Sequence, residues 1–175
     1  MKTVIFKWNP AFSSYSMMHY LNDLNYLREY GLFDYNWSVW DWQQIHEGDR
    51  FYMVKVGRYG QTGIVASGEI TSDPYKDEDW SGKGRETYYV DFLPDVLINP
   101  DALPILTCRE LAAAIPDFEW DRGHSGLVLT DEQAARLDIL WQEFLQRNAV
   151  EYVKANAHED CLYLNDATHI LCGLE

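Results

Sequence analysis

Two neighbouring apolar runs decide the fold of this chain: Gly48-Asp49-Arg50-Phe51-Tyr52-Met53-Val54-Lys55-Val56-Gly57 and Thr62-Gly63-Ile64-Val65-Ala66-Ser67-Gly68-Glu69-Ile70. Both are rich in β-branched and aromatic residues, and Gly57-Arg58-Tyr59-Gly60 joins them, so the pattern predicts an antiparallel hairpin. Residues 50–56 are apolar on both faces, as expected of a strand that is covered on both sides. Gly63 and Gly68 interrupt the second strand, which indicates a bulge or a close approach of another group to the backbone.

Tryptophans lead into this hairpin and are the main candidates for a ligand site. Trp37, Trp40 and Trp42 precede the hairpin, and Trp8 with Asn9 ends an earlier predicted strand. Aromatic faces can hold a flat heterocycle by stacking, at about 1–3 kcal/mol per base, and an amide such as that of Asn9 can read the hydrogen-bonding edge of the heterocycle. The alternative is that these rings fill the core and that Asn9 is a turn residue.

The rest of the pattern predicts strands and helices around the hairpin. Strands are expected over residues 3–8, 33–39, 87–92, 127–129 and 161–164, and helical segments over 14–30, 42–47, 107–115 and 130–147. Ser13-Ser14 is the expected N-cap of the first helix, and Thr107-x-x-Glu110 and Thr130-x-x-Gln133 are capping boxes. Residues 72–85 and 95–106 are expected to be loops. The predicted class is α+β, with a curved, mostly antiparallel sheet.

Length and charge limit the classes of function. The 175 residues are 47% hydrophobic, enough for one domain with a sizeable core, which is expected over residues 1–147 with 148–175 as an extension packed on it. The formal net charge of -14 disfavours non-specific duplex binding through a broad basic face, but it is compatible with a pocket for one base. No signal peptide, no apolar segment long enough to span a bilayer and only three cysteines together predict a protein of the reducing cytoplasm.

Few other groups of residues in the sequence are candidates for a binding or catalytic site. Gly123-His124-Ser125-Gly126 could place N–H groups and a hydroxyl near a ligand, and a plain turn is the alternative. Ser67 lies on the glycine-interrupted strand beside the predicted pocket. The carboxylates of Asp77-Glu78-Asp79 indicate a solvated loop rather than a cation site. Neither a G-x-S-x-G nucleophile motif nor a phosphate-binding glycine-rich loop occurs, so the sequence predicts no catalytic residues and no cofactor.

One spacing occurs twice near the end of the chain, in His158-x-x-Cys161 and His169-x-x-Cys172. Zinc accepts two histidines and two cysteines in tetrahedral geometry. However, only seven residues separate Cys161 from His169, fewer than in the usual zinc finger, and the neighbouring leucines favour a packed strand. We therefore predict no metal here, with a zinc site as the alternative.

An ordered series of motifs resembles the EVE domain and its PUA-like relatives. The series is Phe6-Lys7-Trp8-Asn9-Pro10, Trp40, Gly48-Asp49-Arg50-Phe51-Tyr52, Gly63-Ile64-Val65-Ala66-Ser67-Gly68-Glu69-Ile70, Tyr88-Tyr89-Val90-Asp91-Phe92 and the closing turn, strand and helix over 122–137. The similarity covers most of residues 1–147. It implies a PUA-like pseudo-barrel of mostly antiparallel strands with flanking helices.

The resemblance also implies a function. The family's better-understood members are similar to YTH readers, which hold a modified base in an aromatic pocket, and Trp8, Asn9, Trp40 and Ser125 match the pocket-lining positions. The expected function is thus non-enzymatic recognition of a modified nucleobase in DNA or RNA. The expected ligand-binding residues are Trp8, Asn9, Trp40, Trp42, Ser67, His124 and Ser125. The alternatives are an acidic module that binds a basic protein partner, or a hydrolase of the related ASCH type.

Overall fold

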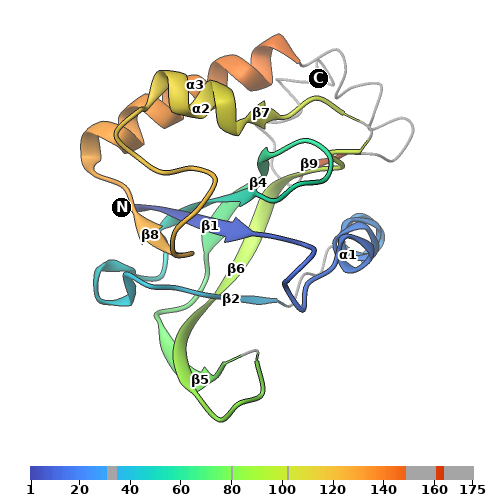
Figure 1. The fold of residues 1–175 in the computed structure, drawn as a ribbon. Coiled ribbons are helices and arrows are strands. Elements are labelled where there is room, and N and C mark those ends of the chain that lie inside the picture. The colour runs from blue at the N-terminus through green and yellow to red at the C-terminus, as the bar shows by residue number, and fades with distance from the viewer. Residues whose placement is uncertain (31–34, 80, 102, 149–160, 164–175) are drawn as a thin grey trace.

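A curled β-sheet with three helices around it forms the fold of the computed structural model (Figure 1). The structure describes residues 1–30, 35–79, 81–101, 103–148 and 161–163. The strands are β1 Thr3–Trp8, β2 Asn36–Ser38, β3 Arg50–Lys55, β4 Gly63–Ile70, β5 Tyr75–Glu78, β6 Glu86–Ile98, β7 Leu106–Thr107, β8 Leu127–Val128 and β9 Cys161–Tyr163. The helical elements are α1 Met17–Tyr30, the 3-10 turn η1 Trp42–Gln44, α2 Cys108–Ala114 and α3 Asp131–Arg147. This element set confirms the α+β class.

The predicted hairpin is the centre of the sheet. β3 and β4 pair antiparallel, and the hydrogen-bonded order of strands is β2-β6-β4-β3-β1-β8. Within the described residues, β1 and β3 are the parallel pair and the other pairings are antiparallel. Residues 51–55 of β3 are all buried, because β3 lies inside the sheet with both faces covered, as the sequence predicts.

Both glycines that interrupt β4 lie where another backbone comes close. A Cβ at Gly68 would lie 2.2 Å from the carbonyl oxygen of Leu93, and one at Gly63 would lie 2.1 Å from that of Leu106. The register between β4 and β6 also shifts between Ser67 and Gly68. The prediction of a bulge or a close approach is therefore confirmed, and the register shift allows β4 to bend along its pairing with β6.

The curl brings two strands together that are not neighbours in the sheet. The ring of Phe6 from β1 is stacked with that of Trp37 from β2, with centroids 6.2 Å apart. The turn at Ser125 and Gly126 bridges the same two regions, since Gly126 N donates to the carbonyl of Ile5 while the carbonyl of Ser125 accepts from Trp40 N. We call this meeting of β1, the end of β2 and the turn 123–126 the seam.

The helices begin largely where the sequence predicts. Both capping boxes form, at Thr107 for α2 and at Thr130 for α3. In Figure 1, α2 and α3 lie together on one side of the sheet and α1 lies apart from them, beside β6. The cap of α1 is a correction: Ser16 accepts from His19 N, so the helix starts at Met17 and not at Ser13-Ser14.

Three expected boundaries are wrong. The region 72–85 contains β5, which pairs with the start of β6, and the 42–47 segment is a short 3-10 turn over 42–44. Strand β6 continues to Ile98, through a region expected to be a loop because of its prolines. Pro94 is tolerated there because it lies opposite Gly68, at the register shift, where a missing N–H costs no regular ladder bond.

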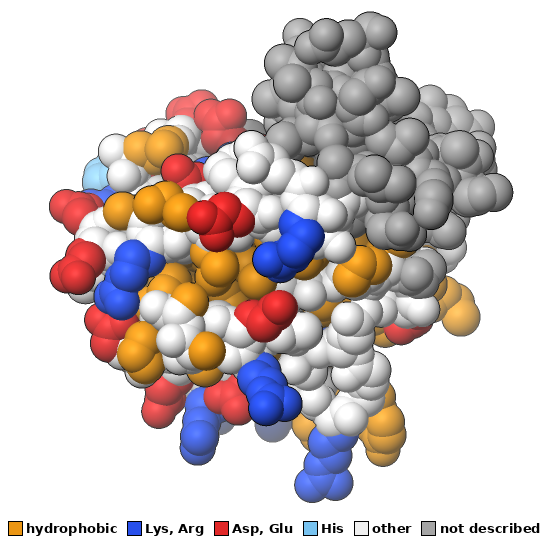
Figure 2. All heavy atoms as spheres, turned by 90° about the horizontal axis from the view of Figure 1, so that it is seen from above, with side chains coloured by type: hydrophobic (Ala, Val, Ile, Leu, Met, Phe, Trp, Pro, Cys, Tyr) orange, Lys and Arg blue, Asp and Glu red, His pale blue; other side chains and the backbone are white. Residues whose placement is uncertain are grey.

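The last described strand comes from the predicted extension. β9 pairs antiparallel with Val96–Ile98 of β6, while the boundary at residue 147 stays a prediction. On the face shown in Figure 2, the described acidic and basic side chains are interspersed with apolar ones. Among the described residues, no helix combines the length and the apolar character that a membrane span requires.

Candidate functional site

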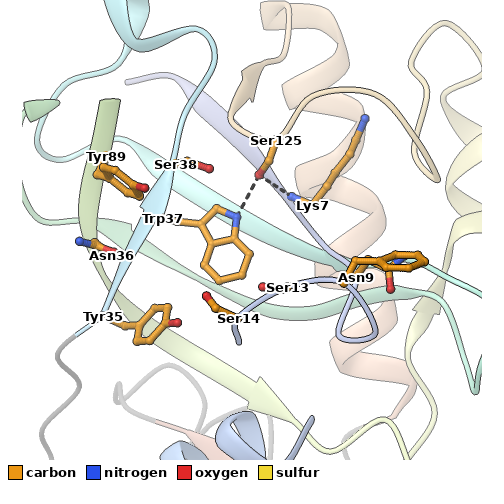
Figure 3. A pocket seen from close by; sticks show the side chains of 11 residues that line it. Lys7, Asn9, Ser13, Ser14, Tyr35, Asn36, Trp37, Ser38, Tyr89 and Ser125 are labelled. Carbon is orange, nitrogen blue, oxygen red and sulfur yellow. Dashed lines mark hydrogen bonds between the residues drawn. The ribbon is translucent and has the colours of Figure 1, made fainter. Parts of the chain in front are cut away.

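A cavity of about 250 Å³ lies at the seam (Figure 3). Phe12, which is 78% exposed, also lines it, so the cavity opens to solvent beside that ring. The other lining residues come from the end of β1, the following loop, β2, β6 and the 123–126 turn: Lys7, Asn9, Ser13, Ser14, Tyr35, Asn36, Trp37, Ser38, Tyr89 and Ser125. The cavity exists here because the curl closes at this point without direct pairing of β1 and β2.

Trp37 is the fixed aromatic wall of the cavity, and Figure 3 shows its indole among the lining side chains. Only 8% of the residue is exposed. Its ring is stacked with that of Phe6 and tilted against that of Tyr35, with centroids 6.2 Å away in each case. Its Nε1 donates to Ser125 Oγ at 2.9 Å. An indole held by rings and by a hydrogen bond cannot turn without breaking these contacts, so its position is preorganised.

Ser125 presents a hydrogen-bond donor at a fixed place. Its Oγ accepts from Trp37 Nε1 and from the backbone N–H of Lys7, each at 2.9 Å. A serine hydroxyl has two acceptor lone pairs and one hydrogen. Since two N–H groups occupy the lone pairs, the hydroxyl can serve a ligand in the cavity only as a donor, and a ligand that meets it must offer an acceptor.

Asn9, in the turn after β1, contributes a side-chain amide to the cavity wall. Its Oδ1 accepts from Ala11 N at 3.1 Å, and its carbonyl accepts from Phe12 N and Ser13 N, so the turn interpretation of Asn9 is confirmed. This turn leaves the side-chain N–H₂ as the part of the amide with donors for a ligand. Asn9 therefore combines a turn role with a place on the cavity wall.

A hydrogen-bonded chain of side chains fixes Asn36. Its Nδ2 donates to the hydroxyl of Tyr75 at 3.0 Å, and that hydroxyl donates to Asp91 Oδ1 at 2.6 Å. Burial, together with the bond to Asp91, raises the pKa of Tyr75 to about 12. The hydroxyl accepts from Asn36 while it donates to Asp91, and these two bonds keep Asn36 in one orientation.

The remaining lining groups are neutral or directed elsewhere. Burial raises the pKa of Tyr35, and it also raises the pKa of the Tyr15 hydroxyl behind it, which donates to Asp23. The side chain of Lys7 leads away from the cavity in Figure 3, and its Nζ donates to the carbonyl of Arg122. Among the described lining residues there is no carboxylate, imidazole or thiol. The cavity wall combines rings, amides and hydroxyls, which suits the binding of a flat polar molecule.

Two tryptophans expected in the pocket are not brought to this cavity. Trp8 is fully buried, with its Nε1 donating to the carbonyl of Tyr15, because the loop after β1 and Tyr20 of α1 cover it. Trp40 is 60% exposed and lies outside, stacked on His124 with ring centroids 3.7 Å apart. The expectation that Trp8 and Trp40 line one pocket together is therefore wrong.

Two further candidates also lie elsewhere. Trp42 is stacked on Tyr88, with centroids 3.8 Å apart. Ser67 is fully buried and donates to Asp95, whose carboxylate also pairs with Arg50 at 2.8 Å. Ser67 thus belongs to a polar cluster of the sheet.

Of the seven candidates from the sequence, Asn9 and Ser125 line the cavity. Trp37, which the sequence also singled out as a candidate aromatic, lines it as well. Sequence reasoning missed Tyr35, Asn36, Ser38 and Tyr89, although the apolar alternation through residues 33–39 was a signal that β2 contributes one face to the interior. For the zinc alternative, His158, His169 and Cys172 lie outside the described residues and Cys161 begins β9, so the absence of a metal stays a prediction.

No protein-family model and no curated protein sequence matches this chain. Similar solved structures include Rpa0253 from Rhodopseudomonas palustris, at 18% identity and a TM-score of 0.47, covering 77% of this chain and 89% of that one. A complex of the Mmi1 YTH domain with RNA is similar at 10% identity and a TM-score of 0.46, covering 84% and 81% of the two chains. The YTH domain of Zygosaccharomyces rouxii MRB1, in complex with N6-methyladenosine RNA, is similar at 14% identity and a TM-score of 0.38, covering 79% and 86%.

Proposed function

We propose that this chain is a non-enzymatic binding module that holds one modified nucleobase of DNA or RNA in the cavity at the seam. The observation that carries the proposal is the bond between Trp37 Nε1 and Ser125 Oγ. This bond holds the indole of Trp37 and the hydroxyl of Ser125 next to each other. A ligand ring with an acceptor on its edge can therefore pack against the indole and accept from the hydroxyl.

The size and chemistry of the cavity support a single base. A volume of about 250 Å³ lies just below the usual range for ligand pockets, about 300–1,000 Å³, which fits one small heterocycle better than a dinucleotide cofactor. Tyr35, Trp37 and Tyr89 supply ring surface, while Asn9 and Ser125 supply donors. A nucleobase has the flat apolar faces and the polar edge that such a lining complements.

The resemblance to EVE domains and their YTH-like relatives is the reason for proposing a modified base, and a PUA-like pseudo-barrel of the EVE type is part of the same proposal. Within it, Asn9 and Ser125 keep the ligand roles expected from the sequence, and Trp37 takes the place expected of Trp8 and Trp40. A base inside a duplex would first have to flip out, at a cost of a few kcal/mol. Single strands and free nucleosides are therefore the ligands to test first.

The test is a calorimetric titration of the full chain with unmodified, N6-methylated, 5-methylated and 5-hydroxymethylated nucleosides. Phe12→Ala is the informative variant, because the ring lines the cavity mouth and is 78% exposed, so its removal leaves the core intact. We expect at least one nucleoside to bind saturably and Phe12→Ala to weaken it at least about fivefold, the low end of a stacking contribution.

Ile139→Ala is the matched control, since Ile139 is a large apolar residue on α3, 62% exposed, that lines neither described cavity. This variant should bind like the wild type. If no nucleoside of the panel binds, or if both variants lose affinity equally, the cavity is not a base site and the proposed function is wrong.

A further inference from the structure

A second cavity of about 370 Å³ adjoins the first. The residues that line it come from the loop after β1, the start of α1, the turn between β3 and β4, and the loop after β6: Asn9, Pro10, Ala11, Met17, Lys55, Val56, Gly57, Arg58, Tyr59, Gly60 and Asp101. Asn9 lines both cavities. The turn is packed tightly against it, since a Cβ at Gly57 would lie 2.9 Å from Asn9 Oδ1. A ligand that fills the first cavity therefore has the second as its immediate neighbour.

A buried cation belongs to this second cavity. Only 2% of Lys55 is exposed, and its Nζ donates to the carbonyl oxygens of Tyr59 at 2.6 Å and Gln61 at 3.0 Å. An ammonium group carries three hydrogens. The two carbonyls take two of them, and within the described residues no carboxylate lies within 4.0 Å of this Nζ. One N–H of a desolvated ammonium is thus left for an anion.

Two exposed side chains of the turn between β3 and β4 lie on the wall of the same cavity as Lys55. Arg58 is exposed and carries a guanidinium, the group best suited to a phosphate through paired N–H donors. The ring of Tyr59 is 78% exposed, which is ample surface for a base to stack on. Asp101 is the one carboxylate among the described lining residues, so the two cations exceed the anionic charge of this wall.

We propose that the second cavity binds the phosphodiester and the neighbouring nucleotide of the strand whose base fills the first cavity. Lys55 and Arg58 contact the phosphate, and the neighbouring base lies on Tyr59. This inference rests on the proposed function and makes it more specific, because it identifies the ligand as a strand rather than a free nucleoside. Phosphate contacts give such a site affinity and register, while the first cavity supplies the selection of the base.

The experiment compares three ligands with the same modified base: the nucleoside, its 3′-phosphate and a single-stranded trinucleotide with that base in the middle, each as ribose and deoxyribose forms. The variants are Arg58→Gln and, as a matched control, Arg109→Gln, which removes an exposed arginine of α2 that lines neither cavity. Both substitutions lie on the surface, and a thermal melt confirms that each variant is folded.

We expect the trinucleotide to bind the wild type at least tenfold more tightly than the nucleoside does. Arg58→Gln should lower the affinity for the trinucleotide about tenfold, as expected for the loss of a charge-assisted contact. The nucleoside should bind Arg58→Gln and Arg109→Gln like the wild type. If the nucleoside binds but the trinucleotide binds no better, the strand inference is wrong while the base site stands. If the two arginine variants behave alike toward the trinucleotide, the second cavity is not the phosphate site. If neither ligand binds, both proposals are wrong.

Discussion

Ser125 connects two segments that are far apart in the chain, since its hydroxyl oxygen serves both the β1 backbone and the indole of Trp37. Ser125→Ala removes this acceptor and leaves two part-buried N–H groups without it. A donor that loses its partner on burial costs about 1–3 kcal/mol. We expect urea unfolding of Ser125→Ala to show a loss of unfolding free energy in that range, together with loss of nucleoside binding.

The control for Ser125 is Ser81→Ala, in the exposed loop between β5 and β6. Hydrogen bonds made by Ser81 lie in solvent, so this variant should remain within about 0.5 kcal/mol of the wild type. Equal stability of the two variants would mean that the Ser125 bonds do not hold the seam.

Tyr15 gives the protein a specific sensitivity to alkali. Burial, assisted by the hydrogen bond to Asp23, raises the pKa of its hydroxyl above the usual 10.0. Between pH 10 and the higher folded pKa, the unfolded chain loses this proton and the folded chain keeps it. Unfolding therefore becomes easier as pH rises, by up to about 1.4 kcal/mol per pH unit for one such group, and this stabilisation is fully present below pH 10.

Tyr15→Phe isolates that effect. Chemical denaturation from pH 7 to 11.5 should show a stability loss above pH 10 in the wild type and a shallower slope in the variant. At pH 7 the variant should be less stable, because it lacks the bond to Asp23. An alkaline slope identical to that of the wild type would contradict the raised pKa.

Single residues were the hardest scale to predict from the sequence. The sequence singled out Asn9 and Ser125, which both line the first cavity, but it could not rank the tryptophans. Trp8 ends a strand whose last five residues are all buried, so no alternation distinguishes a lining ring from a core ring there. Its burial depends on Tyr15 and Tyr20, which a loop and a helix bring back over it. Contacts of that kind leave no periodic signal.

At the scale of elements, Gly68 is the position where β4 and β6 depend most on one missing side chain. A Cβ there would lie 2.2 Å from Leu93 O and 2.7 Å from the Cα of Pro94, both of them backbone atoms that cannot turn away. We expect Gly68→Ala to destabilise the fold by about 1–3 kcal/mol or more, as overpacking does, and to lower the midpoint of thermal unfolding.

Gly48→Ala is the comparison for Gly68→Ala. No atom lies within 4 Å of a Cβ at Gly48, but its φ of 93° disfavours any side chain. That substitution should cost only the backbone strain, on the order of 1 kcal/mol. If Gly68→Ala were the milder of the two, the close approach of β4 and β6 would not constrain the sheet.

Elements whose signals are local were predicted well. The hairpin, both capping boxes and the strand over 3–8 depend on neighbouring residues, and all were confirmed. The end of β6 was missed because its prolines argue locally against a strand. What permits Pro94 is the register shift opposite Gly68, a feature of a partner strand about 25 residues away that periodicity cannot show.

At the scale of the whole molecule, the closure of the sheet and the site are one feature. The seam joins residues 5–7 to residues 37–40 through the turn at 125–126, and the first cavity lies at that junction. The sequence predicted a curved sheet and a pocket separately. It could not place the pocket at the seam, because the seam is made by three segments that meet only when the sheet curls.

The net charge of -14 sets the last prediction, which concerns salt. A strand that contacts two cations, Lys55 and Arg58, releases few counterions, and each phosphate contact of a single strand contributes about -0.7 to the slope of log affinity against log salt. Even if the contacts of Lys55 and Arg58 with the phosphate are counted separately, the slope is no steeper than about -1.4. Repulsion from the acidic surface decreases as salt screens it, over a Debye length of about 10 Å at 0.1 M, and this makes the slope shallower still.

Raising NaCl from 50 to 500 mM should thus lower the affinity for the trinucleotide by less than about 25-fold. Arg58→Gln should make the slope of log affinity against log salt shallower by about 0.7. Affinity for the uncharged nucleoside should stay constant over the same range and serves as the control. A slope as steep as that of an ordinary basic nucleic-acid-binding protein would require many phosphate contacts. Those contacts would have to lie on a surface outside the two cavities, because the described residues of these cavities carry too few cations to make them.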